Sequence, residues 1–246
     1  MFLTIDVGNT SIKWALFDGA LVAQNGRSQS AASLLESLPK TTVHAALIAS
    51  VVPSLTEQLC KALQVGLGIK AQVAGRDFAV PIENRCVPPE RVGVDRLLNA
   101  LAAREMASQS DGRVACVVVD VGSAITVDAV DELGRFLGGA IAPGPDLQAR
   151  ALHEHTALLP LVKVRAPKSP IGRSTDQAIL SGIHWGVVGA ASELVRRIAP
   201  LAGEPAVVFV TGGYGEHIVS ETGGGWRWEP LLTLHGLRLA GERRKH

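Results

Sequence analysis

An acidic, glycine-containing turn near the start of the chain has the residue types needed to hold a phosphate group. It lies within a run of eight residues: Asp6, Val7, Gly8, Asn9, Thr10, Ser11, Ile12 and Lys13. A glycine lets the backbone come close to a ligand, and successive backbone N–H groups in a turn can cradle phosphate oxygens. Lys13 adds a point charge, whereas Asp6 repels phosphate unless a divalent cation, usually Mg²⁺, lies between them. Taken alone, these residues also fit a plain hairpin.

The same arrangement recurs 114 residues later, at Asp120, Val121, Gly122 and Ser123, again between two apolar runs. In each half a further turn signal follows the second run, at residues 18–19 and 131–134. Internal similarity on this scale indicates a duplicated domain. A third glycine turn, residues 211–213, follows the apolar run 207–210.

Two Asp-x-Gly turns and a late Thr-Gly-Gly turn resemble the ATP-binding architecture of the actin-like (ribonuclease H-like) superfamily. This resemblance implies an α/β fold of two duplicated domains, with mixed sheets flanked by helices and ATP in the cleft between the domains. The first two turns would then grip phosphates, and the third would lie by the adenosine. We place the domains at residues 1–112 and 113–246.

Hydrophobic periodicity and turn residues predict alternating strands and helices in both halves. In the first half, strands are expected at residues 2–5, 14–17, 21–23, 45–52 and 72–73, and helices at 31–38, 53–65 and 93–106. In the second half, strands are expected at residues 117–119, 124–127, 134–137, 207–210 and 226–228, and helices at 146–157, 175–198 and 230–240. Residues 138–145, rich in glycine and proline, are predicted to form a loop.

A second cluster of reactive side chains follows a proline-bearing loop at residues 81–92. Asp95 and Arg96 lie in the first turn of the predicted helix, where the helix dipole already favours an acid. The functional alternative is that Asp95 accepts a proton from a substrate hydroxyl, because in phosphoryl transfer an aspartate orients the nucleophile. Arg96 could then hold a carboxylate or phosphate through two parallel hydrogen bonds.

With these residues in place, the chain resembles the type III pantothenate kinase family. The resemblance rests on six segments in the family's order: residues 6–10 with Lys13, 93–96, 120–126, 138–144, 174–179 and 211–213. It implies that ATP phosphorylates the primary hydroxyl of pantothenate to give 4′-phosphopantothenate, the first step of coenzyme A biosynthesis. It also implies a homodimer with active sites near the interface, and a monovalent cation, K⁺ or NH₄⁺, beside the nucleotide.

The resemblance assigns a role to each matching position. The first turn, residues 6–13, would hold the ATP phosphates and Mg²⁺, and Ser123 would bind the nucleotide. Pantothenate would meet five positions besides the general base Asp95: Cys86, Gly93, Val94, Arg96 and Thr175. Asp120 would bind the monovalent cation.

Three positions depart from the family pattern. Ser123 and Ile125 stand where the family usually has threonines, and Ile125 brings no hydroxyl to the expected cation site. Cys86 stands where the family commonly has an aromatic residue. These departures concern the cation site and the pantothenate site respectively.

The long helix at residues 175–198 carries two further signals. Ser174 and Gln177 fit a capping box at its start. Gly182, Gly186 and Gly189 line one helical face. Each glycine weakens a helix by roughly 1 kcal/mol relative to alanine. The expected return is close packing of another helix, either in the core or across a dimer interface.

Composition restricts the other classes of function. Apolar residues make up 47% and charged residues 19%, as in a globular protein in solution. The formal net charge of +1 gives no electrostatic case for nucleic acid or an anionic membrane. We also expect no signal peptide or membrane span. Three widely spaced cysteines (Cys60, Cys86 and Cys116) indicate free thiols in a reducing cytoplasm.

Three alternatives stay open within the superfamily. A sugar-type kinase would use the same nucleotide turns with another acceptor, but such enzymes are usually longer. An ATP-binding filament or chaperone-like protein would need surfaces that 246 residues barely supply. A non-enzymatic regulator on the same scaffold would not require all of Asp6, Asp95 and Asp120. A Walker-type kinase is disfavoured because the chain has no Gly-x-x-x-x-Gly-Lys-Ser/Thr segment.

Overall fold

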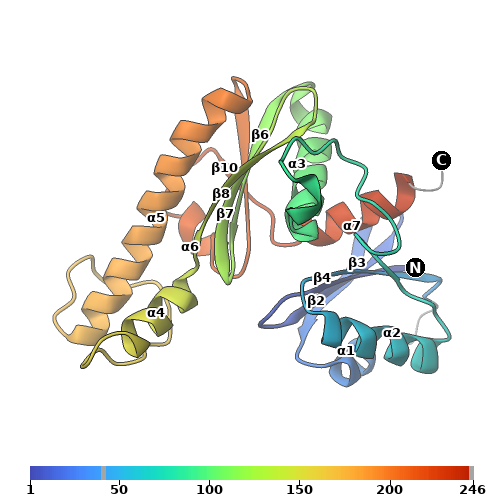
Figure 1. Ribbon diagram of the computed structural model, residues 1–246, viewed down its shortest axis with the longest axis horizontal. Helices are drawn as coiled ribbons and strands as arrows, with labels where there is room; N and C mark the ends of the chain where they lie inside the picture. The colour runs from blue at the N-terminus through green and yellow to red at the C-terminus, as the bar shows by residue number, and fades with distance from the viewer. Residues whose placement is uncertain (40–42, 244–246) are drawn as a thin grey trace. The chain divides into compact units, whose positions relative to one another are not determined.

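The computed structural model describes residues 1–39 and 43–243, which form two compact units (Figure 1). Unit 1 comprises Met1–Glu105 and Leu231–His246, and unit 2 comprises Met106–Pro230. Our sequence-based division at residues 112 and 113 assigned the last helix to the second domain. In the division by contacts, that helix, α7 (Leu232–Arg243), counts with unit 1 because it packs on strands of the first sheet.

Unit 1 is built on a five-stranded mixed sheet with the order β3-β2-β1-β4-β5. Its strands are β1 (Phe2–Val7), β2 (Ile12–Asp18), β3 (Leu21–Ser28), β4 (Ala45–Ser50) and β5 (Gln72–Val73). β1 pairs antiparallel with β2 and parallel with β4, β2 pairs antiparallel with β3, and β4 pairs parallel with β5. A meander is thus followed by parallel crossovers.

Alternation along these strands divides the apolar side chains of unit 1 between two cores. Ile5 and Trp14 lie in the core that contains Leu34 of α1 (Ala31–Ser37) and Leu59 of α2 (Pro53–Leu67). Phe17 lies in a second core with α7. The short helix η1 (Pro89–Arg91) and the long helix α3 (Val94–Asp111) complete the described elements of the first half.

Unit 2 repeats the topology of unit 1 strand for strand. Its strands are β6 (Ala115–Val121), β7 (Ala124–Val130), β8 (Phe136–Pro143), β9 (Ala206–Thr211) and β10 (Trp226–Trp228). Their order, β10-β9-β6-β7-β8, and their pairing directions match those of β5-β4-β1-β2-β3. The predicted duplication of an α/β domain is therefore confirmed.

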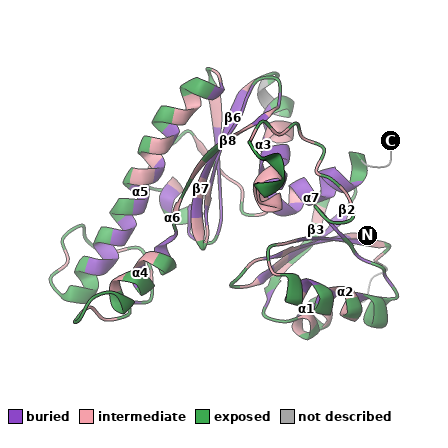
Figure 2. Ribbon diagram, in the orientation of Figure 1, coloured by how far each residue is buried: buried purple, intermediate pink, exposed green. Residues whose placement is uncertain are grey.

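One face of the second sheet is covered by α5 (Thr175–Ala202), which Figure 1 shows as the long helix beside it. Figure 2 shows that buried and exposed positions alternate along this helix, as on an amphipathic core helix. In the described part of the chain, α5 is the one helix long and apolar enough to cross a membrane, but 50% of its most apolar window is buried inside the protein. Unit 2 also contains α4 (Pro145–Glu154) and α6 (Gly215–Val219).

The prediction of a loop at residues 138–145 was wrong. Residues up to Pro143 pair with β7 and form most of β8. Glycine is required within this strand because a side chain at Gly139 would collide with the carbonyl oxygen of Val127. Gly139 thus allows two backbones to approach, and Gly138, with a φ of +102°, lies where the β7–β8 register shifts.

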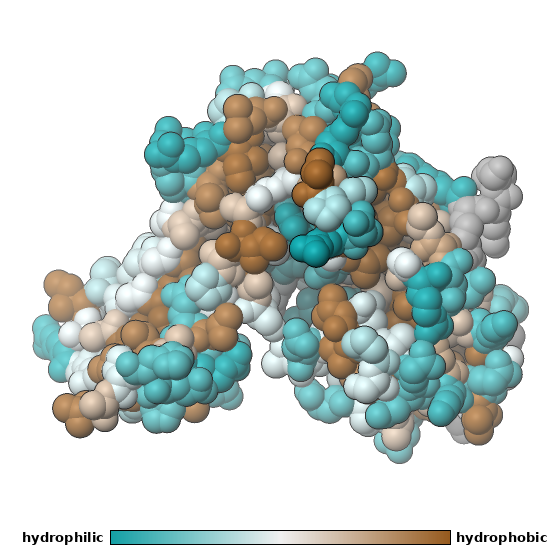
Figure 3. Space-filling view, in the orientation of Figure 1, coloured by the Kyte–Doolittle hydropathy of each residue, from teal (hydrophilic) through white to brown (hydrophobic). Residues whose placement is uncertain are grey.

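The glycine face of α5 also differs from the core-packing expectation. Gly182, Gly186 and Gly189 are exposed, and apart from the neighbouring residues and backbone of α5 itself no described atom lies within 4 Å of a Cβ placed on any of them. In the space-filling view, residues of intermediate hydropathy gather over this helix (Figure 3). The alternative, packing against a second copy of the chain, stays a prediction.

Candidate functional site

The acid of the first turn projects from the end of β1 beside a lysine. Asp6 is half-buried, and alternation places it on the opposite sheet face from Ile5 and Val7. The β1–β2 register sets Asp6 directly opposite Lys13, which is also half-buried. A carboxylate and an ammonium group therefore share one face at the start of the loop.

The loop from Gly8 to Ser11 is closed by a hydrogen bond from the Gly8 amide to the Ser11 carbonyl oxygen, 3.2 Å long. Gly8 has no positive φ, and an added Cβ would make only an ordinary contact, at 3.6 Å from that oxygen. The local fold therefore does not require glycine at this position. Asn9 and Thr10 are exposed, and with Asp6 they offer the oxygen ligands that Mg²⁺ prefers.

The second turn reproduces the first with a shorter loop. The Gly122 amide donates to the Ala124 carbonyl oxygen at 3.0 Å. The β6–β7 register places Asp120 opposite Thr126, so Thr126 occupies the position that Lys13 has in the first copy. The first acid thus faces a cation and the second faces a hydroxyl group.

Two further glycines pack onto the second turn from segments distant in sequence. Gly144 donates its amide to the Ser123 carbonyl oxygen at 3.1 Å, and a Cβ on Gly144 would lie 2.5 Å from the same oxygen. Gly212 has a φ of +94°, and a Cβ there would lie 2.5 Å from Asp120 Oδ1. Unit 2 thereby gathers three glycine-containing segments, at residues 122, 144 and 212, around Asp120.

Ile125 does not face this group of polar atoms. Its side chain is 1% exposed and lies in the core with Val121 and Val127, packed under α5. The matching residue of the first copy, Ile12, is also fully buried. The hydroxyl-bearing residue opposite Asp120 is instead Thr126, one residue further along β7.

Asp95 lies in the first turn of α3, as predicted, and its carboxylate folds back over the helix start. Oδ1 accepts a hydrogen bond from the Arg96 amide at 3.0 Å. Within the described residues, Oδ2 has no hydrogen-bond partner and so can accept a hydrogen bond from a further donor. A Cβ on Gly93 would collide with Oδ1, so only glycine leaves room for this conformation.

The remaining residues that were predicted to contact pantothenate are divided between the two units. Cys86 is half-buried, and its amide donates to Asn84 Oδ1 at 3.0 Å, which shapes the proline-bearing loop of unit 1. Val94 is half-buried at the start of α3. Thr175 is exposed at the first position of α5 in unit 2, next to the N-cap Ser174.

Only one of the two hydrogen bonds of the predicted capping box is formed at this helix. Ser174 Oγ accepts from the Gln177 amide at 3.3 Å. The Gln177 side chain, however, accepts from the Arg173 amide at 2.9 Å, one residue before the cap. The glutamine therefore fixes the preceding loop rather than the cap residue itself.

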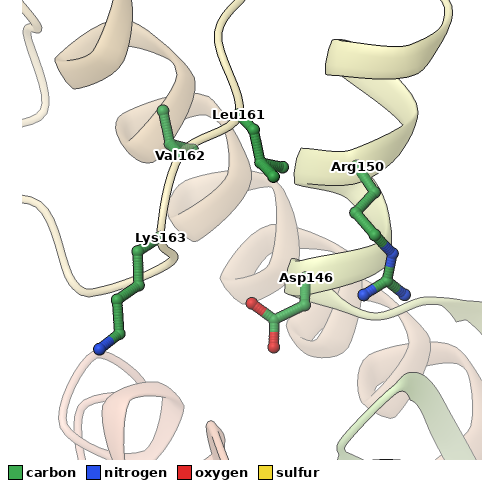
Figure 4. Close-up of a pocket in the computed structure, with 5 residues that line it drawn as sticks. All are labelled: Asp146, Arg150, Leu161, Val162 and Lys163. Atoms are coloured by element: carbon green, nitrogen blue, oxygen red, sulfur yellow. The ribbon is translucent and has the colours of Figure 1, made fainter.

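A pocket of about 350 Å³ lies between α4 and the segment that follows it. Figure 4 shows Asp146 and Arg150 on the helix, and Leu161, Val162 and Lys163 on the opposite segment. It carries two cations and one acid, and α4 begins directly after Gly144, which contacts the second turn. No group of three or more His, Cys, Asp or Glu side chains suited to a metal occurs in the described ranges 1–39 and 43–243.

Sequence reasoning overlooked Thr126 and the packing role of Gly144. Period-two alternation would have found Thr126, because Asp120 and Thr126 come to lie side by side once the two strands are paired as in the first copy. No local pattern marks Gly144, since its contact with Ser123 depends on the course of β8.

Comparisons with known proteins show which family the chain resembles. The family model described as type III pantothenate kinase matches residues 2–197. A type III pantothenate kinase of Dehalococcoides mccartyi strain CBDB1 is 35% identical over 96% of this chain and 94% of its own. A type III pantothenate kinase from Rhodospirillum rubrum is 36% identical over 99% of this chain and 98% of its own.

Solved structures support the fold. The activator of the 2-hydroxyisocaproyl-CoA dehydratase from Clostridium difficile, solved with bound ADPNP, has a TM-score of 0.54 at 13% identity and covers 99% of this chain. The match covers 97% of the activator's own chain. Component A of the (R)-2-hydroxyglutaryl-CoA dehydratase from Acidaminococcus fermentans also has a TM-score of 0.54, at 17% identity, over 98% of both chains. These similarities concern the actin-like fold alone.

Proposed function

The chain belongs to the type III pantothenate kinase family, and from this premise we propose how its residues divide the work of phosphoryl transfer. The protein is a pantothenate kinase that uses ATP to form 4′-phosphopantothenate, the first step of coenzyme A biosynthesis. The observation that carries this assignment is similarity to named type III pantothenate kinases over 96% to 99% of the chain. A sugar-type kinase or a regulator is not favoured.

The two Asp-Gly turns take the phosphates of ATP. Gly8 leaves the first loop open to a ligand, and Lys13 supplies a positive charge on the same face as Asp6. Asp6 and the loop oxygens are suited to Mg²⁺, which when bound offsets the repulsion between the carboxylate and the phosphates. Ser123, exposed in the second turn, is suited to the nucleotide.

Asp95 acts as the general base toward the primary hydroxyl of pantothenate. Its Oδ1 is held by the Arg96 amide, and its Oδ2 has no hydrogen-bond partner among the described residues. Arg96 holds the pantothenate carboxylate, since a guanidinium group matches a carboxylate through two hydrogen bonds. Gly93, Val94, Cys86 and Thr175 complete the proposed contacts with the acceptor.

Asp120 holds a monovalent cation, K⁺ or NH₄⁺. Unlike Asp6, it has no lysine opposite it across the strand pair, but the Thr126 hydroxyl. The charges of a half-buried carboxylate and of nearby phosphates repel each other, and a bound cation offsets that repulsion. Carboxylate, hydroxyl and carbonyl oxygens together form a suitable donor set for such a cation.

The active form is a homodimer in the cytoplasm. The exposed glycines of α5 and the neighbouring Trp185, which is 37% exposed, form a face that could receive the same helix of a second copy. Three free cysteines fit a reducing compartment.

The experiment that tests this function is incubation of the purified protein with ATP, Mg²⁺, K⁺ and one acceptor at a time. Pantothenate should yield a product heavier by one phosphoryl group in mass spectrometry. Glucose and N-acetylglucosamine should yield none. Phosphorylation of a sugar in place of pantothenate would replace this function with the sugar-type kinase.

A further inference from the structure

Tyr214 directly follows the third glycine turn and fastens that turn to the second one. Its amide donates to the Val121 carbonyl oxygen at 3.0 Å. Because Gly212 has no space for a side chain against Asp120 and Val121, the two turns are in direct backbone contact. A displacement of Tyr214 would therefore displace the backbone beside Asp120.

The side chain of Tyr214 is anchored on the far side by α5. It is 9% exposed, and its hydroxyl lies 3.0 Å from Nδ1 of His184, which is 1% exposed. This is a buried bond between side chains 30 positions apart in the sequence. It connects the core helix of unit 2 to the glycine turn.

The direction of the bond follows from the surroundings of the imidazole. Burial lowers the pKa of His184, so its ring is neutral at pH 7. Nε2 faces the Glu221 carboxylate at 3.9 Å, which favours the ring proton on that nitrogen. Nδ1 is then an acceptor, and Tyr214 donates. Burial and the charge of Asp146 raise the pKa of Tyr214 to about 12, which keeps the hydroxyl protonated.

The first copy provides an internal comparison. There the backbone after β4 is also tied to the glycine turn, by the Val51 amide donating to the Val7 carbonyl oxygen at 3.3 Å. Val51, however, is 48% exposed and carries no polar anchor. The buried tyrosine–histidine bond is thus an addition specific to unit 2.

We propose that Tyr214 and His184 are positioning residues for nucleotide binding, which hold the third glycine turn against the second. This inference rests on the proposed function, because it assumes that the turns of unit 2 bind ATP. Neither side chain takes part in the chemistry. Their loss should therefore weaken ATP binding and leave pantothenate use unchanged.

The test measures ATP-analogue affinity by calorimetry together with steady-state kinetics. Tyr214→Phe removes only the hydroxyl group. It should raise both the Kd of a non-hydrolysable ATP analogue and the KM for ATP about 2- to 10-fold, the range expected for one hydrogen bond. The KM for pantothenate and the kcat should stay at wild-type values. His184→Leu should have the same effect. The double variant should bind the ATP analogue no more weakly than either single variant does.

Two comparisons separate positioning from general stability. His184→Asn keeps an acceptor near the position of Nδ1 and should recover most of the ATP affinity. Thr233→Val removes another buried side-chain hydrogen bond, 2.8 Å from Thr233 Oγ1 to Asn99 Oδ1 in unit 1, and should lower the Tm without changing ATP affinity.

Two results would lead to different conclusions. If Tyr214→Phe and His184→Leu lower only the Tm, as Thr233→Val does, the positioning role is wrong. If the wild-type protein binds no ATP analogue, the proposed function fails instead.

Discussion

The carboxylate of Asp95 is held in one orientation by the first turn of its own helix. Oδ1 receives the Arg96 amide, and Gly93 provides the space for this arrangement. An acid in this position also benefits from the helix dipole, so its geometry alone fits both a structural and a catalytic role. Substitution can separate the two.

Asp95→Asn keeps the size of the side chain and an acceptor for the Arg96 amide, but it removes the basic oxygen. Positioned proton transfer contributes ~10²–10⁴-fold to a rate, so kcat should fall by about that factor. The Kd for an ATP analogue and the Tm should stay close to wild type. An Asn variant with normal turnover would show that Asp95 is only a helix-start residue.

Asp120 and its neighbours provide a matched test of the monovalent cation. Activity should rise with K⁺ in a Tris buffer, and Asp120→Asn should abolish this response. The thermal shift produced by K⁺ in the presence of an ATP analogue should disappear as well. A flat response of the wild-type protein to K⁺ would mean that no such cation is needed.

Thr126 and Ile125 serve as the control pair for this site. Thr126→Val should raise the K⁺ concentration required for half-maximal activity, because Thr126 lies opposite Asp120 across the strand pair. Ile125→Thr introduces a hydroxyl into the apolar core and should lower the Tm without improving the K⁺ response. Improved K⁺ affinity in Ile125→Thr would contradict the placement of this side chain in the core.

At the scale of elements, the glycine turns depend on close backbone contact. Gly212→Ala would place a Cβ 2.5 Å from Asp120 Oδ1 in a left-handed conformation. That conformation alone costs roughly 1–2 kcal/mol for an L-residue. We expect a lower Tm and a large loss of ATP affinity, measured by thermal unfolding and calorimetry.

Gly213→Ala is the control for this substitution. Apart from its two chain neighbours, no described residue comes within 4 Å of a Cβ at Gly213, and its φ is not positive. Its free energy of unfolding should change by no more than about 0.5 kcal/mol, as for ordinary surface substitutions. Equal destabilisation by both variants would show that the packing of Gly212 on the second turn is not what matters.

The elements themselves were largely predictable from sequence. Apolar runs of strand length and the repeated Asp-x-Gly turns were enough to predict the duplicated mixed sheets. The strand conformation of residues 138–143 was not predictable, because glycines locally indicate a loop. This segment belongs to β8 only because it pairs with β7. Strand register decides which residues lie opposite the two acids: Lys13 opposite Asp6, and Thr126 opposite Asp120. These pairings were not identified from sequence alone. Family resemblance supplied the roles of Asp120, Ser123 and Thr175.

At the scale of the whole molecule, duplication gives two acidic turns with different partners. Lys13 lies opposite the first acid across its strand pair, whereas Thr126 lies opposite the second. The same topology can therefore serve two distinct tasks at the nucleotide.

The proposed dimer is also tested at this scale. Gly186→Arg introduces a long charged side chain on the exposed glycine face of α5 and should shift a dimer to monomers in analytical ultracentrifugation. Val65→Arg is the control, because Val65 is 88% exposed on α2 in unit 1. A Gly186→Arg protein that stays dimeric would place the interface elsewhere.

The most direct test of the central claim is the rate of ADP release by the wild-type protein with and without pantothenate. With Mg²⁺-ATP and K⁺ saturating, ADP release should depend on pantothenate and match the amount of 4′-phosphopantothenate formed, mole for mole. Slow ADP release that is indifferent to pantothenate, with no phosphorylated product, would contradict the account.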